Sequence, residues 1–320
     1  MTQTATSAAS YSPPSQADTW VYYEGEVRRY RDAHVGLMTH ALHYGTGCFE
    51  GIRAYWNEEQ GQLYALQMVP HYQRLIASAK VLQMTVPHTV DEMCAITIDL
   101  LRRNGFREDV YIRPLVYKAS EEIGVRLHNL RDGFAIYMAP FGPYVDVENG
   151  LRCMVSSWRR VDDNAAPARA KVTGIYINSA LAKTEAMENG YDEAIVLNHD
   201  GHVSEGSAEN LFIIRKGVVS TPSPTENILE GITRDALIHL FREEMGLDVV
   251  ERTIDRNELY VADEVFLCGT GAQVAPVIEI DRRRIGDGEP GPITLKVQRD
   301  YFDICKGRNP KYAEWLAPVY

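Results

Sequence analysis

A short segment at residues 141–150 divides the chain into two parts that each contain both strand-like and helix-like patterns. It carries Gly-Pro, two acidic residues and Asn-Gly, which are typical of turns and linkers. A chain of 320 residues is long enough for about two domains of roughly 150 residues each. We therefore predict a flexible tail at 1–18, a smaller domain at 19–140, a linker at 141–150 and a larger domain at 151–320.

Both parts alternate between apolar runs of strand length and amphipathic runs of helix length. In the first part we predict a hairpin over 20–30, strands over 48–55, 62–67, 109–117 and 134–139, a helix starting near Pro70, and a helix over 90–103. In the second part we predict strands over 151–157, 193–197, 211–214 and 265–268, and helices over 177–189, 233–245 and 294–305. The expected fold class is α/β (α+β), with two α/β domains and an active site at their junction.

Charge and composition exclude several classes of function. The net charge of −11 makes the chain a poor nucleic-acid binder, although it still allows a locally basic pocket for one small anion. No apolar run approaches the roughly 20 residues that span a bilayer, so we expect no membrane helix. The five cysteines are scattered and form no CxxC pair, which argues against disulfides or a zinc site. Residues 1–17 lack the pattern of a secretory signal, and we expect a cytoplasmic protein.

Two ionisable residues stand in unusual settings. Lys171 lies between alanine and valine, where a lowered pKa would make its amine a nucleophile. The alternative is a solvated loop lysine. Glu205 lies among small residues directly before an apolar strand, which suggests that the backbone packs closely against a flat group. The alternative is an ordinary polar turn between strands.

Two other segments could bind an anion through backbone N–H groups. Ile232 and Thr233 open a clear helix, whose first N–H groups attract anions. Thr270 stands between two glycines after a buried strand. Simple helix capping and a tight turn are the alternatives.

Paired polar residues suggest two further sites. His40 and His43 are three residues apart, but only Glu50 is close enough to help them hold a metal, and we expect none. Tyr111 and Arg113 are two apart on a predicted strand, so both project from one face. They could receive a carboxylate, or Arg113 could form a surface salt bridge.

The order of these features along the chain resembles the branched-chain amino acid aminotransferases, pyridoxal-phosphate enzymes of fold type IV. The resemblance covers about residues 20–317. The segments that carry it are HALHYGTGCFEGIRAY, HYQRLIASAK, YIRPLVY, SSWRR, ARAKVTGIYINSALAKTEA, VSEGSAENLF, GITRDAL and LCGTGAQVAPV. Lys171 and Glu205 are 34 positions apart, as in that family.

The resemblance implies pyridoxal 5′-phosphate as cofactor. It implies that Lys171 forms the Schiff base and moves a proton, that Glu205 faces the pyridine nitrogen and that Tyr176 bonds the phenolic oxygen. The implied phosphate site consists of Arg74, Ile232, Thr233 and Thr270.

The resemblance also implies the substrates, L-leucine, L-isoleucine and L-valine with 2-oxoglutarate, in a ping-pong reaction. The implied substrate residues are an apolar wall of Phe49, Tyr144 and Ala272, an α-carboxylate site of Tyr111 and the turn Thr270, Gly271 and Ala272, and Arg113 for the γ-carboxylate. Tyr44 is implied to reach the neighbouring subunit's site, and residues 124–126 to lie on a loop at that interface. This gives a homodimer or a higher homo-oligomer, with a hexamer as one option.

Two departures and three alternatives qualify this interpretation. Ala166 and Phe141 stand where relatives carry a larger aliphatic residue and a tryptophan, and either difference could admit aromatic amino acids or amines. A D-amino acid or amine transaminase, an aminodeoxychorismate lyase and a non-catalytic ligand-binding relative are the competing functions.

Overall fold

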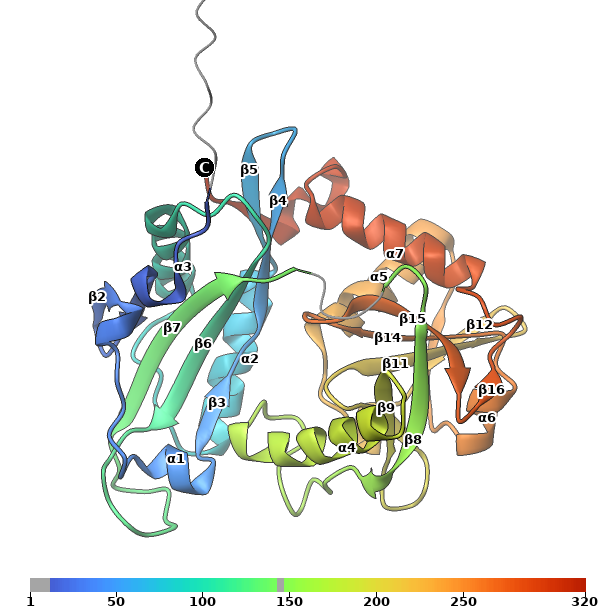
Figure 1. The fold of residues 1–320 in the computed structure, drawn as a ribbon, viewed down its shortest axis with the longest axis horizontal. Coiled ribbons are helices and arrows are strands. Elements are labelled where there is room, and N and C mark those ends of the chain that lie inside the picture. Colours follow the sequence, from blue (N-terminus) through green and yellow to red (C-terminus); the bar gives the residue numbers. More distant parts are fainter. Residues whose placement is uncertain (1–11, 143–146) are drawn as a thin grey trace, which may run out of the picture.

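The computed structural model describes residues 12–142 and 147–320, and it contains two β-sheets with helices packed on each (Figure 1). Within these residues the first sheet has eight strands and the second has nine. Short 3-10 turns join the larger elements: η1 (Gln16–Asp18), η2 (Tyr30–Asp32), η3 (Thr173–Ile175), η4 (Pro224–Glu226) and η5 (Pro310–Trp315).

The first sheet is antiparallel and mostly built from the first half of the chain. Its strands are β1 (Trp20–Tyr23), β2 (Glu26–Arg29), β3 (Gly47–Phe49), β4 (Ile52–Asn57), β5 (Gln62–Leu66), β6 (Val110–Lys118), β7 (Asp132–Pro140) and β17 (Leu316–Pro318). The order is β17-β5-β4-β6-β7-β1-β2, and β3 pairs with β6. The helices of this half are α1 (His40–Tyr44), α2 (Met68–Val81) and α3 (Val90–Asn104).

The second sheet mixes parallel and antiparallel pairs. Its strands are β8 (Leu151–Arg159), β9 (Glu193–Leu197), β10 (Val203–Gly206), β11 (Asn210–Arg215), β12 (Val218–Thr221), β13 (Val249–Glu251), β14 (Glu264–Gly269), β15 (Gln273–Ile280) and β16 (Arg283–Arg284). The order is β10-β9-β8-β15-β14-β11-β12-β13, and β16 pairs with β15. The helices are α4 (Tyr176–Glu188), α5 (Ile232–Met245), α6 (Arg256–Tyr260) and α7 (Pro292–Cys305).

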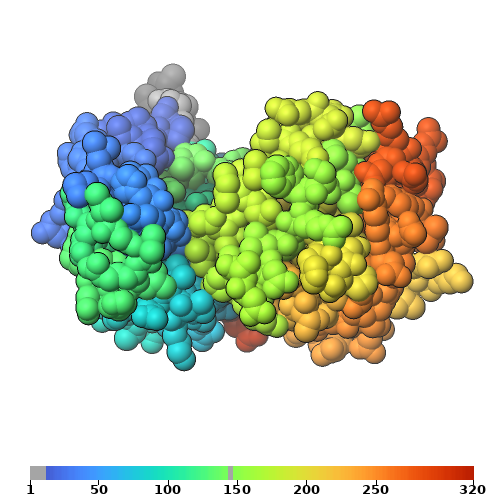
Figure 2. Space-filling view, turned by 90° about the horizontal axis from the view of Figure 1, so that it is seen from below, coloured from blue at the N-terminus to red at the C-terminus, as the bar shows by residue number. Residues whose placement is uncertain are grey.

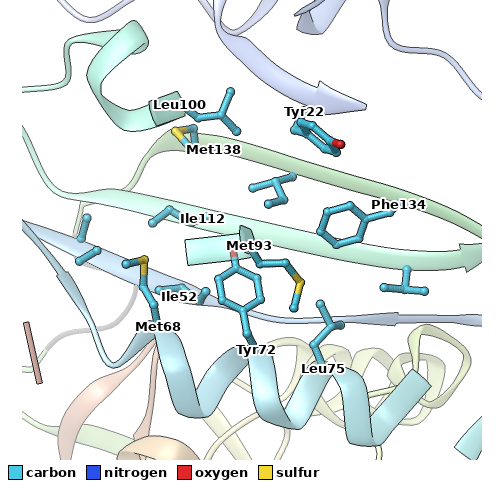
Figure 3. Packing of buried hydrophobic residues seen from close by; sticks show 14 of the residues in the cluster. Tyr22, Ile52, Met68, Tyr72, Leu75, Met93, Leu100, Ile112, Phe134 and Met138 are labelled. Carbon is cyan, nitrogen blue, oxygen red and sulfur yellow. The ribbon is translucent and has the colours of Figure 1, made fainter. Parts of the chain in front are cut away.

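Apolar side chains fix the helices on the sheets. Figure 3 shows Tyr72 and Leu75 of α2 packed against the strands of the first sheet, with Met93 and Leu100 of α3 in the same cluster. Tyr72 and Leu75 are fully buried, and emptying such a core position costs about 2–5 kcal/mol of stability. A second cluster holds α5 and α7 against β11, β14 and β15.

Most predicted elements are confirmed because their sequence signals are local. Helix α3 starts as predicted, with Thr89 as its N-cap. The Thr89 hydroxyl accepts from the Glu92 N–H, and the Glu92 carboxylate accepts from the Thr89 N–H. The hairpin turn at Glu24 and Gly25 has positive φ at both residues, the geometry that joins two paired strands tightly. Helices α4, α5 and α7 lie within two residues of their predicted bounds.

The continuous strand predicted over 48–55 is wrong. The structure has two strands there, β3 and β4, interrupted at Glu50 and Gly51. A side chain at position 51 would have to displace the Tyr111 ring, because a Cβ there would come 2.1 Å from the Tyr111 hydroxyl. Glu50 turns its carboxylate toward His71 and Arg74 of α2. The break depends on these distant partners and not on a local signal.

The chain's last strand, β17, pairs with β5 in the first sheet. The two sheets therefore do not divide the sequence at a single point. Strand β7 ends at Pro140 and β8 begins at Leu151, on either side of the proposed linker. The domain bounds given above stay a prediction. Among the described residues, no helix is both long enough and apolar enough to cross a membrane.

Candidate active site

A cavity of about 300 Å³ is lined by residues from both sheets. This volume is at the lower end of the range for small-molecule sites. The predicted site residues that line it are Phe49, Arg74, Tyr111, Arg113, Lys171, Tyr176, Glu205, Ile232, Thr233, Thr270, Gly271 and Ala272. Segments up to about 220 positions apart in the sequence thus converge on one space, as the interpretation of an active site between two domains requires.

Lys171 is held in the cavity by contacts on both its backbone and its side chain. Its backbone N–H donates to Ser78 of α2 at 3.0 Å, and its carbonyl accepts from the N–H of Phe49 at 3.1 Å. Its Nζ donates to the Tyr176 hydroxyl at 2.7 Å. The alternative of a solvated loop lysine does not hold, because the amine has a fixed partner in a shared cavity.

Glu205 is a buried carboxylate with a strong partner. Its Oε1 lies 2.8 Å from Nη2 of Arg160, and Oε2 accepts from Asn210 Nδ2 at 3.1 Å and from the Leu229 N–H at 3.0 Å. Burial raises the pKa of Glu205, and Arg160 opposes this shift. These contacts fix one carboxylate against the cavity, so the alternative of a plain polar turn does not hold.

Arg74 lies on α2 and is oriented by an acid that sequence reasoning considered only for a metal. Its Nε and Nη2 donate to the Glu50 carboxylate at 2.7 and 2.9 Å, a bidentate contact. Burial raises the pKa of Glu50, but Arg74 and His71 outweigh it and hold that pKa well below its usual range. The remaining Nη1 donates to the Glu230 carbonyl at 2.8 Å, directly before α5. A fixed positive charge is therefore placed beside the first turn of α5.

The first turn of α5 offers N–H groups to the cavity. Gly231 is its N-cap and provides no capping side chain, while Ile232 and Thr233 both line the cavity. The first N–H groups of a helix have no partner within the helix and favour an anion. Thr270 and Gly271 come from a different part of the sequence, the turn between β14 and β15, and they line the same cavity. Sequence reasoning named both segments, and the structure brings them together.

Tyr111 and Arg113 project from one face of β6, as predicted. Arg113 Nη2 donates to the Tyr111 hydroxyl at 3.1 Å, and its guanidinium lies 4.3 Å from the centre of the Phe49 ring. Among the described residues no carboxylate forms an ion pair with Arg113, and its Nε is buried without a partner. The salt-bridge alternative therefore does not hold for the described part of the chain.

Two predicted features lie outside the lining of the cavity, and a third falls outside the described residues. Tyr44, at the end of α1, is outside the lining of the cavity, and its hydroxyl accepts from the Gly124 N–H at 3.2 Å. Tyr144 lies outside the described residues. His40 contacts Thr46 and the Gly124 carbonyl. Within 12–142 and 147–320, no group of three or more His, Cys, Asp or Glu side chains could hold a metal ion.

Sequence reasoning gave no role to several residues that lie in the cavity or at its edge. Arg160 stands in a run of polar residues after β8, and its pairing with Glu205 spans 45 positions. Arg53 and Glu209 are likewise buried and had no assigned role. None of these carries a local signal, because each acts through a partner that only the fold brings near.

Glu209 predicts a pH-dependent loss of stability. Burial, together with the nearby Glu193 carboxylate, raises the pKa of Glu209 to about 8 from an ordinary 4.5. The folded state therefore holds a proton that the unfolded chain releases, so stability is full below about pH 4.5 and falls as the pH rises toward 8. We expect Glu209→Gln to flatten this fall, measured as the unfolding midpoint of the holoprotein from pH 5 to 9. Exposed Glu188→Gln is the matched control, and an unchanged slope in Glu209→Gln would contradict the expectation.

Comparisons with known proteins identify the family of the chain. The family model described as amino-transferase class IV matches residues 47–280, which is most of the chain. The chain belongs to the class IV aminotransferase family. A probable branched-chain-amino-acid aminotransferase of Aquifex aeolicus is 52% identical over 301 residues, covering 94% of this chain and 97% of the relative.

Solved structures of class IV aminotransferases show the same fold. The branched-chain aminotransferase of Thermoproteus uzoniensis with norvaline has a TM-score of 0.90 and 45% identity, covering 94% of this chain and 99% of that one. The enzyme of Thermobaculum terrenum in its pyridoxal-phosphate form has a TM-score of 0.91 and 40% identity, covering 96% and 100%. The fold type IV class predicted above is thereby confirmed.

Proposed function

We propose that this class IV aminotransferase transfers the amino group of L-leucine, L-isoleucine or L-valine to 2-oxoglutarate with pyridoxal 5′-phosphate as cofactor. The observation that carries the proposal is that Lys171 Nζ, held 2.7 Å from the Tyr176 hydroxyl, shares one cavity with buried Glu205 and with the first turn of α5. Amine, carboxylate and anion site are the three groups that this cofactor requires.

The cavity residues fit the cofactor by their chemistry. Lys171 would hold the aldehyde, Glu205 the ring nitrogen and Tyr176 the phenolic oxygen. Arg74, the N–H groups at Ile232 and Thr233, and Thr270 would hold the phosphate. The α5 N-cap supplies no side chain of its own, which leaves its first N–H groups available to an anion.

Each of these residues has a distinct task in the reaction. When bound, pyridoxal phosphate supplies an electron-withdrawing ring and a carbonyl that accepts the amino group in the first half of a ping-pong cycle. Lys171 would remove the substrate Cα proton and later return a proton. Its amine can do this when it is no longer attached to the cofactor. Glu205, kept in place by Arg160, favours a protonated ring nitrogen by its negative charge. Tyr176 orients the Lys171 amine through their hydrogen bond.

The substrate side is proposed from the same cavity. Tyr111 and the turn of Thr270, Gly271 and Ala272 would bind the α-carboxylate. Phe49 and Ala272, with Tyr144, would contact the branched side chain. Arg113, which forms no ion pair with a carboxylate among the described residues, would bind the γ-carboxylate of glutamate.

Steady-state turnover tests the substrate proposal. We expect the purified holoenzyme to convert L-leucine, L-isoleucine and L-valine with 2-oxoglutarate, and to leave D-alanine and aminodeoxychorismate untouched. Turnover of D-alanine without turnover of L-leucine would contradict the substrate and keep the cofactor assignment. A protein that stays colourless after addition of pyridoxal phosphate would support a non-catalytic relative instead.

We also propose that the protein works as a homodimer or a larger assembly. Large apolar side chains are exposed around α1 and the adjacent loop: Leu37, Met38, Leu42, Ile123 and Val125. Figure 2 shows this region of the first half beside the segment that contains α4, on one face of the molecule. Leu37, Ile123 and Val125 are 86%, 84% and 79% exposed, and large exposed apolar side chains that gather in one region typically mark a contact with another protein.

Light scattering of the protein as it elutes from a gel-filtration column measures the mass of the assembly. We expect a mass of at least twice the 36.1 kDa chain. Substituting Leu37 and Ile123 by aspartate should shift the mass toward one chain, because a desolvated carboxylate at a contact is costly. A wild-type mass of one chain at micromolar concentration would contradict the proposal.

We further propose the cytoplasm as the place of action. All five cysteines are free thiols in the structure, which suits a reducing compartment.

A further inference from the structure

Arg53 of β4 reaches from the first sheet to the edge of the cavity. It is 2% exposed. Its Nη1 donates to the Gly271 carbonyl at 3.3 Å, and its Nη2 donates to the carbonyls of Phe141 and Gly142 at 2.9 Å each. One guanidinium therefore joins three segments: β4, the start of the proposed linker, and the turn between β14 and β15.

The Arg53 guanidinium lies closer to backbone carbonyls than to any described carboxylate. The carboxylate described nearest to it, that of Asp109, lies 3.9 Å from Nη2. Aromatic rings of Phe141 and Tyr55 lie 5.0 and 5.4 Å from the guanidinium carbon, and its Nε is buried without a partner in the described residues. A buried, incompletely paired charge costs stability, which suggests that its task is to hold these carbonyls in place.

A second side chain of β4 holds the other end of the same turn. Tyr55 is two residues after Arg53, so both project from one face of the strand. The Tyr55 hydroxyl accepts from Gln273 Nε2 at 3.3 Å, and Gln273 has φ of 61°, an uncommon conformation for a residue with a side chain. The turn is thus fixed on both sides of Ala272 by residues of the other sheet.

The geometry of the peptide bond links this contact to the cavity. The Gly271 carbonyl and the Ala272 N–H belong to one planar trans peptide, so they point in opposite directions. The carbonyl points at Arg53, which is outside the described lining of the cavity, while Gly271 and Ala272 belong to that lining. The bond to Arg53 therefore turns the Ala272 N–H away from Arg53.

We infer that Arg53 is a positioning residue for the substrate's α-carboxylate, acting through the peptide between Gly271 and Ala272. The inference rests on the proposed function, in which this turn receives that carboxylate. Arg53 does not touch the substrate. It fixes the Ala272 N–H before the substrate binds, so that substrate binding does not have to order the turn.

Binding of two matched substrate analogues tests the inference. 4-Methylpentanoate carries the leucine skeleton with a carboxylate, and 4-methylpentanamide is its neutral counterpart. Their dissociation constants are measured on the holoenzyme by titrating the visible absorption and, independently, by the shift in unfolding temperature. In Arg53→Met we expect the acid to bind about tenfold more weakly and the amide within about twofold, because a displaced Ala272 N–H weakens a charge-assisted hydrogen bond to the acid but only a weaker, neutral one to the amide. Exposed Arg215→Met is the matched control.

A lysine variant separates positioning from charge. Arg53→Lys keeps the charge but cannot span the carbonyls as a planar fork, so we expect an intermediate, acid-selective loss of about threefold. Wild-type binding in Arg53→Lys would show a charge effect and overturn the inference, as would equal weakening of acid and amide in Arg53→Met. If Arg53→Met does not fold, Arg53→Lys carries the test by the same criterion. Failure of the wild-type enzyme to bind the acid would instead overturn the proposed function.

Discussion

Replacing Lys171 with alanine is expected to lower kcat for transamination of L-leucine by a factor of about 10⁴ or more. Proton transfer by a well-placed amine contributes up to about this factor, and removal of the amine also removes the covalent attachment of the cofactor. Lys171 is the only lysine among the described residues that line the cavity. Nothing in the described lining can therefore take over its role.

The measurement for Lys171 is single-turnover kinetics after saturation with pyridoxal phosphate. Lys171→Arg should be equally inactive, because a guanidinium keeps its proton at any working pH. Lys80→Ala, at an exposed position of α2, should behave as wild type. Turnover of Lys171→Ala within tenfold of wild type would refute the role given to this residue.

Replacing Glu205 with glutamine is expected to lower kcat about 10²-fold or more with a much smaller change in KM. The amide has nearly the same shape but no negative charge, so the ring nitrogen loses the group that favours its protonation. The change also leaves Arg160 as a buried charge without its partner, and breaking such a pair costs about 3–5 kcal/mol of stability.

Two controls separate chemistry from stability at Glu205. The unfolding midpoint of each variant shows whether the loss of activity occurs in folded protein. Glu205→Asp retains the charge at a shifted position and should lose less activity than Glu205→Gln. Equal kcat for Glu205→Gln and wild type, in folded holoenzyme, would remove Glu205 from the mechanism.

Local patterns predicted the longer helices and most strands of the first sheet, but they missed β15, which has eight residues. Helix α3 could be predicted because its cap and its apolar spacing lie within one continuous segment. The break between β3 and β4 could not, because it needs the Tyr111 hydroxyl beside Gly51. Strand β17 was missed because three residues at the end of the chain form a strand only against β5.

The candidate site shows the same division. Lys171 and Glu205 were found because the order and spacing of their motifs resemble a known family. Arg160 and Arg53 were missed because each binds a group more than 40 positions away, and only the fold makes those pairs. Resemblance thus proposes the groups that carry the chemistry, while the structure shows which residues contact those groups.

The most direct test of the central claim is one half-reaction of the purified holoenzyme. L-Leucine is added without any oxo acid, and the visible absorption of the bound cofactor is followed, with D-alanine as the parallel control. We predict that L-leucine removes the visible band in a single turnover and that D-alanine leaves it unchanged. No response to L-leucine, together with loss of the band on addition of D-alanine, would contradict the assignment of L-branched-chain amino acids as substrates.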